Sequence, residues 1–165
     1  MKKLITLCAA LAAMFLAGCQ KEEGPKVAGP VTHKHEHKPL HGGTPVELGH
    51  EEYHVELVID PAEGKLRAYV MDGELENFVR IAAESFEIDA RLAEGTQPLV
   101  FKAIANNATG EKVGDSSLYE AQADWLKKTN VFDATLKEIV VRGTAYRDVN
   151  FNFPKGNDQD ETTAK

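Results

Sequence analysis

Histidines are concentrated in one short part of this 165-residue sequence. All six lie between positions 33 and 54, and four of them form the series His33, His35, His37 and His41. Neutral imidazole is a good ligand for Zn(II), Cu(II) and Ni(II), and a polar chain can fold several imidazoles around one ion. The series therefore predicts a divalent transition-metal site, to which Glu36 could add an oxygen ligand. The alternative interpretation is a solvated linker in which histidine is one polar residue among others.

A second histidine pattern, His50-Glu51-Glu52-Tyr53-His54, matches the H-E-x-x-H motif of zinc proteases. That motif works on a helix, where residues four apart share a face. Here it follows Gly49 and runs into a strand pattern, in which four residues span about 13 Å. We therefore reject the protease interpretation and predict that His54 and Glu56 form an accessory metal site on the outer face of a strand. The alternative is an exposed polar strand face without a metal.

The start of the chain resembles the signal of a bacterial lipoprotein. Two lysines precede the apolar stretch 4–17, which is too short to span a bilayer as a helix. Leu16-Ala17-Gly18-Cys19 follows and is similar to the lipobox, so we expect cleavage before Cys19 and acylation of its thiol with chains such as palmitate. The protein would then be anchored in the bacterial cell envelope, facing the periplasm. Gln20, in place of the aspartate that retains lipoproteins at the inner membrane in enterobacterial relatives, favours the outer membrane.

Cleavage would restrict the chemistry of the mature chain. Removing 18 of the 165 residues leaves 147, and the loss of two lysines changes the formal charge from −7 to −9. An acidic chain without a basic stretch argues against a nucleic-acid partner. Cys19 would be the only remaining cysteine and Met71 the only methionine. Cu(I) prefers sulfur ligands, so Zn(II), Cu(II) or Ni(II) bound by nitrogen and oxygen fits better.

A strand-rich region must position these candidate ligands. Alternation of apolar and polar residues predicts a strand over 53–59, a turn over 60–64 and a returning strand over 65–71. Further alternation is seen over 79–83, 86–92 and 99–105, and a last hairpin is expected over 136–153 around Gly143. Residues 75–86 also fit an amphipathic helix, and 121–129 predict one short helix or turn.

These elements predict an all-β domain, specifically an antiparallel immunoglobulin-like β-sandwich with one short helix. We expect four parts along the chain. They are a lipoprotein signal peptide over 1–18, a flexible histidine-rich tether over 19–49, the sandwich over 50–153 and a disordered tail over 154–165.

Several motifs resemble one family, over about residues 41–92. They are His41-Gly42-Gly43, Gly49, the YHVELV segment 53–58, the GKL segment 64–66 and the YVMD segment 69–72. They are similar to small periplasmic His-Gly-Gly domains, which occur as short lipoproteins and attached to periplasmic adaptor subunits of heavy-metal efflux systems. The resemblance implies a β-sandwich associated with metal handling. It marks as motif positions His41, Gly42, Gly43, His54 and Glu56. The membrane-fusion hairpin and lipoyl-like parts of an adaptor are not found in the sequence.

The leading hypothesis is a non-enzymatic periplasmic lipoprotein that binds a divalent transition metal and buffers it or delivers it to an efflux or homeostasis system. The second hypothesis is an interaction module that binds an envelope protein, with incidental histidines. An enzyme is the third and is not predicted, because the serines at 85, 116 and 117 have no histidine nearby in the sequence.

Overall fold

The structure, a computed structural model, describes residues 38–157. These residues form eight strands and one turn of 3-10 helix, η1. In chain order the elements are β1 (Thr44–Leu48), β2 (Tyr53–Asp60), β3 (Lys65–Asp72), β4 (Ser85–Leu92), β5 (Gly95–Ala103), β6 (Leu118–Gln122), η1 (Asp124–Lys127), β7 (Phe132–Val141) and β8 (Thr144–Phe153). Within 38–157, no helix has the length and apolar character needed to cross a membrane.

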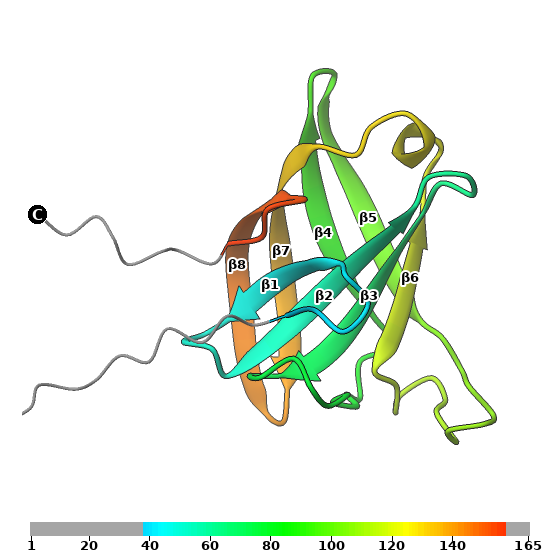
Figure 1. The fold of residues 1–165 in the computed structure, drawn as a ribbon, viewed down its shortest axis with the longest axis vertical. Coiled ribbons are helices and arrows are strands. Elements are labelled where there is room, and N and C mark those ends of the chain that lie inside the picture. The colour runs from blue at the N-terminus through cyan, green and yellow to red at the C-terminus, as the bar shows by residue number, and fades with distance from the viewer. Residues whose placement is uncertain (1–37, 158–165) are drawn as a thin grey trace, which may run out of the picture. The chain divides into compact units, whose positions relative to one another are not determined.

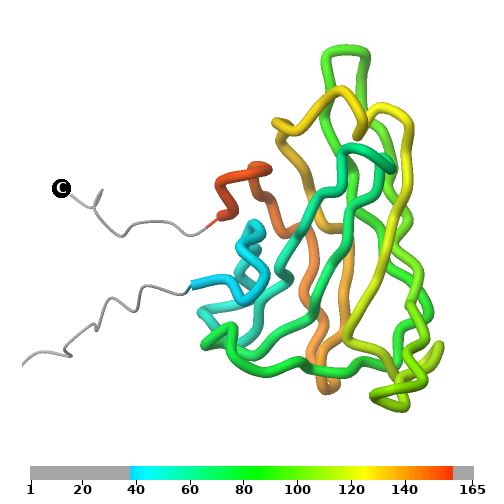
Figure 2. Tube along the Cα trace, turned by 45° about the vertical axis from the view of Figure 1, so that its right-hand side comes forward, coloured from blue at the N-terminus to red at the C-terminus, as the bar shows by residue number. Residues whose placement is uncertain are grey.

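All eight strands belong to one antiparallel sheet with the order β1-β2-β3-β6-β5-β4-β7-β8 (Figure 1). The sheet curls so that its two edge strands, β1 and β8, approach each other (Figure 2). The residues that follow β8 join these edges. The Thr44 hydroxyl donates a hydrogen bond to the Pro154 carbonyl at 3.1 Å, and the Asn157 side chain exchanges two hydrogen bonds with the main chain of Glu47.

The prediction of an antiparallel all-β fold is confirmed, but the two separate sheets of an immunoglobulin-like sandwich are not observed. The reason is the short strand β6, which lies partly in the segment predicted as a helix. β6 pairs with β3 on one side and with β5 on the other, so hydrogen bonds run without a break from β1 to β8. The predicted short helix is present only as η1.

The long strands form where the sequence alternates. In β3, Leu66, Ala68 and Val70 point into the core and are fully buried. The turn before β3 is stabilised by Asp60, whose Oδ1 accepts hydrogen bonds from the N–H groups of Ala62 and Glu63. This use of an aspartate side chain is typical of tight turns. The hairpin predicted from these residues is therefore present as β2 and β3.

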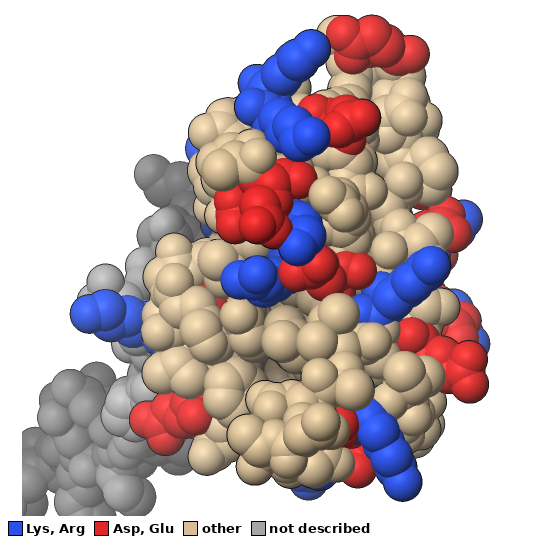
Figure 3. All heavy atoms as spheres, turned by 90° about the vertical axis from the view of Figure 1, so that its right-hand side faces the viewer, with Lys and Arg blue, Asp and Glu red and all other residues tan. Residues whose placement is uncertain are grey.

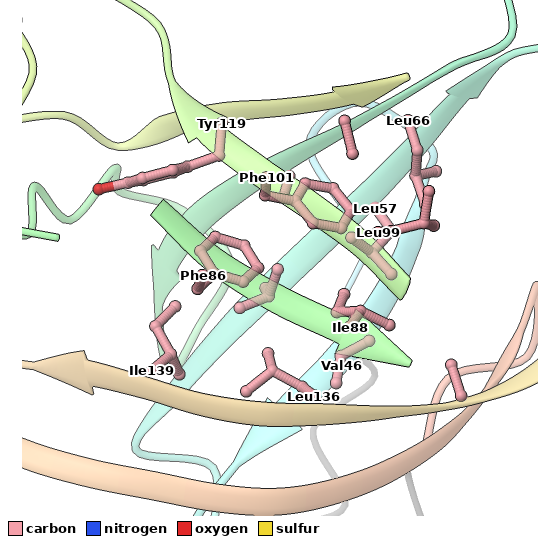
Figure 4. Packing of buried hydrophobic residues seen from close by; sticks show 14 of the residues in the cluster. Val46, Leu57, Leu66, Phe86, Ile88, Leu99, Phe101, Tyr119, Leu136 and Ile139 are labelled. Carbon is pink, nitrogen blue, oxygen red and sulfur yellow. The ribbon is translucent and has the colours of Figure 1, made fainter. Parts of the chain in front are cut away.

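Aromatic side chains fill the interior between the two halves of the curled sheet (Figure 4). Phe86 and Phe101 stack with their ring centroids 5.0 Å apart, and Tyr119 packs against Phe86 at 5.1 Å. Tyr119 is completely buried, and its hydroxyl donates a hydrogen bond to the Ala83 carbonyl at 2.7 Å. This hydrogen bond attaches the segment before β4 to β6.

The stretch 75–86 is neither the continuous strand nor the helix considered from the sequence. Val79 and Ile81 are buried. Before β4 begins, however, the segment takes part in strand pairing only through two isolated β-bridges, Met71–Phe78 and Ile81–Ser116. The segment thus crosses the end of the sheet while directing alternate apolar side chains inward.

Two predicted boundaries shift. Strand β1 lies inside the stretch predicted as tether, and it pairs along its whole length with β2. Residues 154–157, predicted as disordered, pack against β1, where a side chain at Gly156 would place its Cβ 2.2 Å from the Pro45 carbonyl oxygen. The folded region therefore begins earlier and ends later than the sequence indicated.

Charged side chains on the face shown in Figure 3 are of both signs and intermixed. On β3 and β6, Lys65 and Arg67 lie beside Glu120, at 3.6 and 3.1 Å. Exposed pairs of this kind each contribute only about 0–1 kcal/mol. This face carries no large field of a single sign.

Candidate functional site

Glu56 is the most unusual residue of the described chain, because it is a carboxylate with no exposed surface. It lies in the middle of β2, on the face opposite Val55 and Leu57. Its Oε1 accepts hydrogen bonds from the main-chain N–H groups of His41 and Gly43, at 2.7 and 2.9 Å. Burying a charge is costly unless hydrogen bonds replace its hydration. The loop before β1 supplies those hydrogen bonds.

The imidazole of His41 completes the shell around Glu56. Its Nδ1 lies 2.8 Å from Glu56 Oε2, while 30% of the His41 side chain remains exposed. Because a carboxylate oxygen accepts, Nδ1 carries the proton, and the lone pair of the neutral ring lies on Nε2. Among residues 38–157, nothing forms a hydrogen bond to Nε2. The ring is thus oriented by a buried carboxylate with its other nitrogen available.

Two aromatic rings fix the plane of that imidazole. The ring of Tyr69 stacks on His41 with centroids 3.9 Å apart and an angle of 11° between the planes. Phe78 lies at 5.8 Å from His41 and 6.1 Å from Tyr69. Tyr69 is the cross-strand partner of Glu56, so neighbouring positions of one sheet face hold the acid and the stacking ring. His41 covers both.

The two glycines of the His-Gly-Gly motif have different physical roles. Gly42 has a φ of +66°, a left-handed conformation that favours glycine, and its surroundings are open. Gly43 passes so close to β2 that a Cβ there would lie 2.5 Å from the Leu57 carbonyl oxygen. The two glycines therefore allow the backbone conformation that places the His41 ring and the N–H groups of His41 and Gly43 against Glu56.

His54 and Glu56 were predicted on an exposed strand face, and that expectation is wrong. His54 is only 4% exposed, and Glu56 is fully buried. The loop before β1 packs on Glu56, and the loop after β3 brings Phe78 beside His41, neither of which a local sequence pattern reveals. The Nδ1 of His54 lies 3.4 Å from the main-chain oxygen of Asp72.

The carboxylate of Asp72 caps the loop after β3. It accepts hydrogen bonds from the N–H groups of Glu76 and Asn77 and from the Asn77 side chain. Desolvation alone would raise the pKa of Asp72, but the hydrogen bonds from Asn77 and Glu76 outweigh it and lower that pKa below its usual value. This loop supplies Phe78 to the His41 site.

The remaining candidate ligands are distributed as follows. His33, His35 and His37, like Glu36 and the lipidation site Cys19, lie outside the described residues. His50 belongs to an exposed turn and His54 to β2, so the H-E-x-x-H pattern does not lie on a helix. Within the part of the chain that the structure describes, no three histidine, cysteine, aspartate or glutamate side chains gather as a metal site would require.

Sequence reasoning identified His41 and Glu56 separately but did not pair them. It included Tyr69 only within the motif segment 69–72, and it assigned neither Tyr69 nor Phe78 to the site. A detectable feature was a glutamate at an alternating position within an otherwise apolar strand, since such a residue needs a partner when its face is covered. No family model, curated protein or solved structure significantly matches the chain.

Proposed function

We propose that the protein is a non-enzymatic binder of a divalent transition metal, Zn(II), Cu(II) or Ni(II), in the bacterial envelope. The observation that carries this proposal is His41, the last residue of the histidine series, whose ring is held by the buried Glu56 at 2.8 Å. Histidines that ligate metals commonly donate their second ring N–H to a carboxylate, which fixes the ring and raises its basicity. His41 has this arrangement.

Pre-ordering of one ligand lowers the entropic cost of the site. Fixing a residue costs roughly 1–2 kcal/mol, and a site built only from a polar segment must order every ligand on binding. His41 is already oriented by Glu56 and Tyr69. We propose that His41 provides the first ligand and that His33, His35 and His37 complete the site through Nε2 or Nδ1. Glu56 is then a positioning residue rather than a ligand, and His54 takes no part.

The expected role is buffering the metal or handing it to an efflux or homeostasis system. Ligands drawn from a polar segment exchange readily, which suits transfer better than permanent storage. The motif resemblance of residues 41–92 to His-Gly-Gly domains, which is a prediction from the sequence, points to the same role.

Isothermal titration of the full mature protein with Zn(II), Cu(II) and Ni(II) tests the proposal. We expect measurable binding, a loss of at least tenfold in affinity for the combined His33→Ala, His35→Ala and His37→Ala variant, and a loss of about tenfold for His41→Ala and Glu56→Gln. His50→Ala is the matched control, because His50 is an exposed turn residue that lies outside the series 33–41 in the sequence. If the wild-type protein bound none of the three ions, the proposed function would be refuted.

We further propose that acyl chains on Cys19 anchor the protein, facing the periplasm at the outer membrane. Mass spectrometry of the N-terminal peptide should show cleavage before Cys19 and an added diacylglycerol. Cys19→Ala should abolish the modification and release the protein from sedimented membranes, whereas a wild-type protein found unmodified in the soluble fraction would contradict the anchor.

A further inference from the structure

Strands β4 and β7 are hydrogen-bonded along only part of their length. Their pairing runs from Arg91 with Asp133 to Ile88 with Leu136 and stops there. β7 continues for five more residues, to Val141, paired only with β8. An opening of about 550 Å³ lies between the two strands at this end, where Figure 1 shows them separating. We call it the β4–β7 opening. Six residues define it: Ala82, Ser85 and Phe86 on one side, and Glu138, Ile139 and Val140 on the other.

The strands separate because β7 and β8 contain a local irregularity. Lys137 and Asp148 are skipped in an otherwise continuous register, and Asp148 has a φ of +53°. Lys137 and Glu138 are both exposed, so the alternation of buried and exposed residues shifts by one position here. In a strand, the main-chain groups of alternate residues face alternate neighbours. A shift of the alternation by one residue therefore changes from odd-numbered to even-numbered residues the set whose N–H and C=O groups face β4. Beyond Lys137, β7 therefore leaves the register of β4.

The hairpin that ends β7 shows which main-chain groups point into the opening. Arg142 and Gly143 form a two-residue loop with φ values of +48° and +89°, as in a type I′ turn. In such a hairpin the closing pair, Val141 and Thr144, is mutually hydrogen-bonded, and alternate residues face outward. Glu138 and Val140 consequently direct their N–H and C=O groups away from β8, toward the opening.

The opposite wall presents a main-chain edge as well. Ala103 N–H donates to the Glu84 carbonyl at 3.0 Å, and this hydrogen bond flanks the Ser85–Lys102 pair. Ser85 therefore belongs to a non-hydrogen-bonded pair with β5, so its own N–H and C=O point toward β7. Two backbone edges, each with donors and acceptors, face each other across the opening. Within the described chain, neither edge has a strand partner at these residues.

We propose that the β4–β7 opening binds an extended peptide segment of a partner protein by strand addition. Main-chain groups on both walls can pair with such a segment, as in other cases where a peptide adds a strand to a sheet edge. The proposal is independent of metal binding.

The side chains around the opening specify the peptide further. Phe86 and Ile139 lie on the interior side (Figure 4), and both are nearly completely buried, so side chains of the peptide that face inward should be apolar. Arg142 lies at the mouth and forms no ion pair with any other residue in 38–157. Arg80, on the other wall, is already engaged by Asp115 at 3.4 Å. An acidic residue next to Arg142 is thus the expected charged contact.

Capped heptapeptides of the pattern Glu-Xaa-Thr-Xaa-Thr-Xaa-Glu, with Xaa as valine, leucine or phenylalanine, are suitable probes. Amide NMR of the full mature protein should show shifts and slowed hydrogen exchange at Ser85, Glu138 and Val140 on addition of at least one peptide. A copy N-methylated at alternate residues keeps the side chains but lacks the N–H donors along one edge, so it can pair with only one wall and should bind at least tenfold more weakly. Ala82→Trp should fill the opening and weaken binding at least tenfold. Ala108→Trp, at another exposed alanine, should not change it.

Three results would overturn the proposal. The first is no binding of any of the three peptides at millimolar concentration, and the second is equal binding of the N-methylated copies. The third is protection of the Glu138 and Val140 amides in the protein alone, because the chain itself would then fill the opening. Loss of metal binding in the titrations above would leave these results unaffected, so the two proposals can fail separately.

Discussion

At the scale of single residues, the His-Gly-Gly motif and Glu56 form one structural unit. The carboxylate accepts three hydrogen bonds, two of them from main-chain N–H groups, and all three donors lie 13 to 15 residues away in sequence. Hydrogen bonds to a charged group typically contribute about 1.5–3 kcal/mol each, and an unsatisfied partner costs a similar amount. Glu56 should therefore influence stability as well as the orientation of His41.

Substitution of Glu56 separates these two roles. Glu56→Ala leaves the N–H groups of His41 and Gly43 without their acceptor, so we expect the free energy of unfolding to fall by about 2–3 kcal/mol. Glu56→Gln keeps one oxygen for those N–H groups and should lose only about 1 kcal/mol. Urea titration followed by circular dichroism measures both. Glu74→Gln, at an exposed loop position, is the control and should change stability by less than about 0.5 kcal/mol. Equal stability of all three variants would show that Glu56 is not integrated in the loop.

The two motif glycines should respond differently to alanine. At Gly42 the cost is conformational, about 1–2 kcal/mol for a left-handed backbone, and Gly110 with a φ of +73° and open surroundings should match it. At Gly43 the Cβ meets a main-chain oxygen 2.5 Å away, so β1 or the loop must move. We expect Gly43→Ala to be the most destabilising of the three, by about 2–3 kcal/mol. Thermal unfolding of the three variants gives the order, and a Gly43→Ala protein as stable as Gly110→Ala would disprove the close approach.

At the scale of elements, the short strand β6 joins the two halves of the sheet. It pairs through five residues with β3 but through only two with β5. Tyr119 on β6 reinforces this junction, because its hydroxyl reaches the Ala83 carbonyl at 2.7 Å. The same hydrogen bond positions the segment that forms one wall of the β4–β7 opening.

Removal of that hydroxyl should weaken the junction without creating a large cavity. Tyr119→Phe leaves the half-buried Ala83 carbonyl without the Tyr119 donor, so we expect the free energy of unfolding to fall by about 1–2 kcal/mol. Hydrogen exchange should also accelerate at residues 81–86 more than in β2. Tyr69→Phe is a matched control, since the Tyr69 hydroxyl makes no hydrogen bond with residues 38–157, and its stacking on His41 is preserved. A Tyr119→Phe loss no greater than that of Tyr69→Phe would contradict this function of the hydroxyl.

At the scale of the whole molecule, two buried tyrosines connect stability to alkaline pH. Burial raises the pKa of Tyr119 to about 12, and burial together with the hydrogen bond to Glu52 raises that of Tyr146 to about 12. Tyrosine is charged when deprotonated, so a raised pKa means that the folded state retains the proton longer than the unfolded state. Stability should therefore decrease as pH rises from about 10 to about 12.

Phenylalanine variants isolate this effect from the lysines that titrate in the same range. We expect the free energy of unfolding of Tyr146→Phe to fall less steeply between pH 10 and 12 than that of the wild type. Tyr119→Phe should show the same change of slope in addition to its loss at neutral pH. Urea midpoints at several pH values, together with ultraviolet titration of the phenolates, provide the measurement. Identical slopes in all three proteins would contradict the raised values.

The sequence by itself determined the class of the fold and most of its long strands. Alternation located β2, β3 and β4, and the glycine at 143 correctly marked the last hairpin, because these are local patterns of burial and turn conformation. It also singled out His41 and Glu56 as noteworthy. It did not determine β6, whose five residues lie partly in a segment of good helix formers and form a strand by pairing with β3 and β5.

Only the tertiary structure decided what the polar residues of β2 do. Alternation placed His54 and Glu56 on a face that would have been exposed if the sheet stood alone, but both residues are buried, and the loop before β1 packs on Glu56. Whether a carboxylate is a solvated ligand or a buried acceptor depends on what packs over it, which is a long-range property. The same reason applies to the β4–β7 opening. The alternation of buried and exposed residues in β7 shifts at Lys137, and this shift has a consequence only because β4, a strand distant in sequence, does not pair with β7 beyond that point.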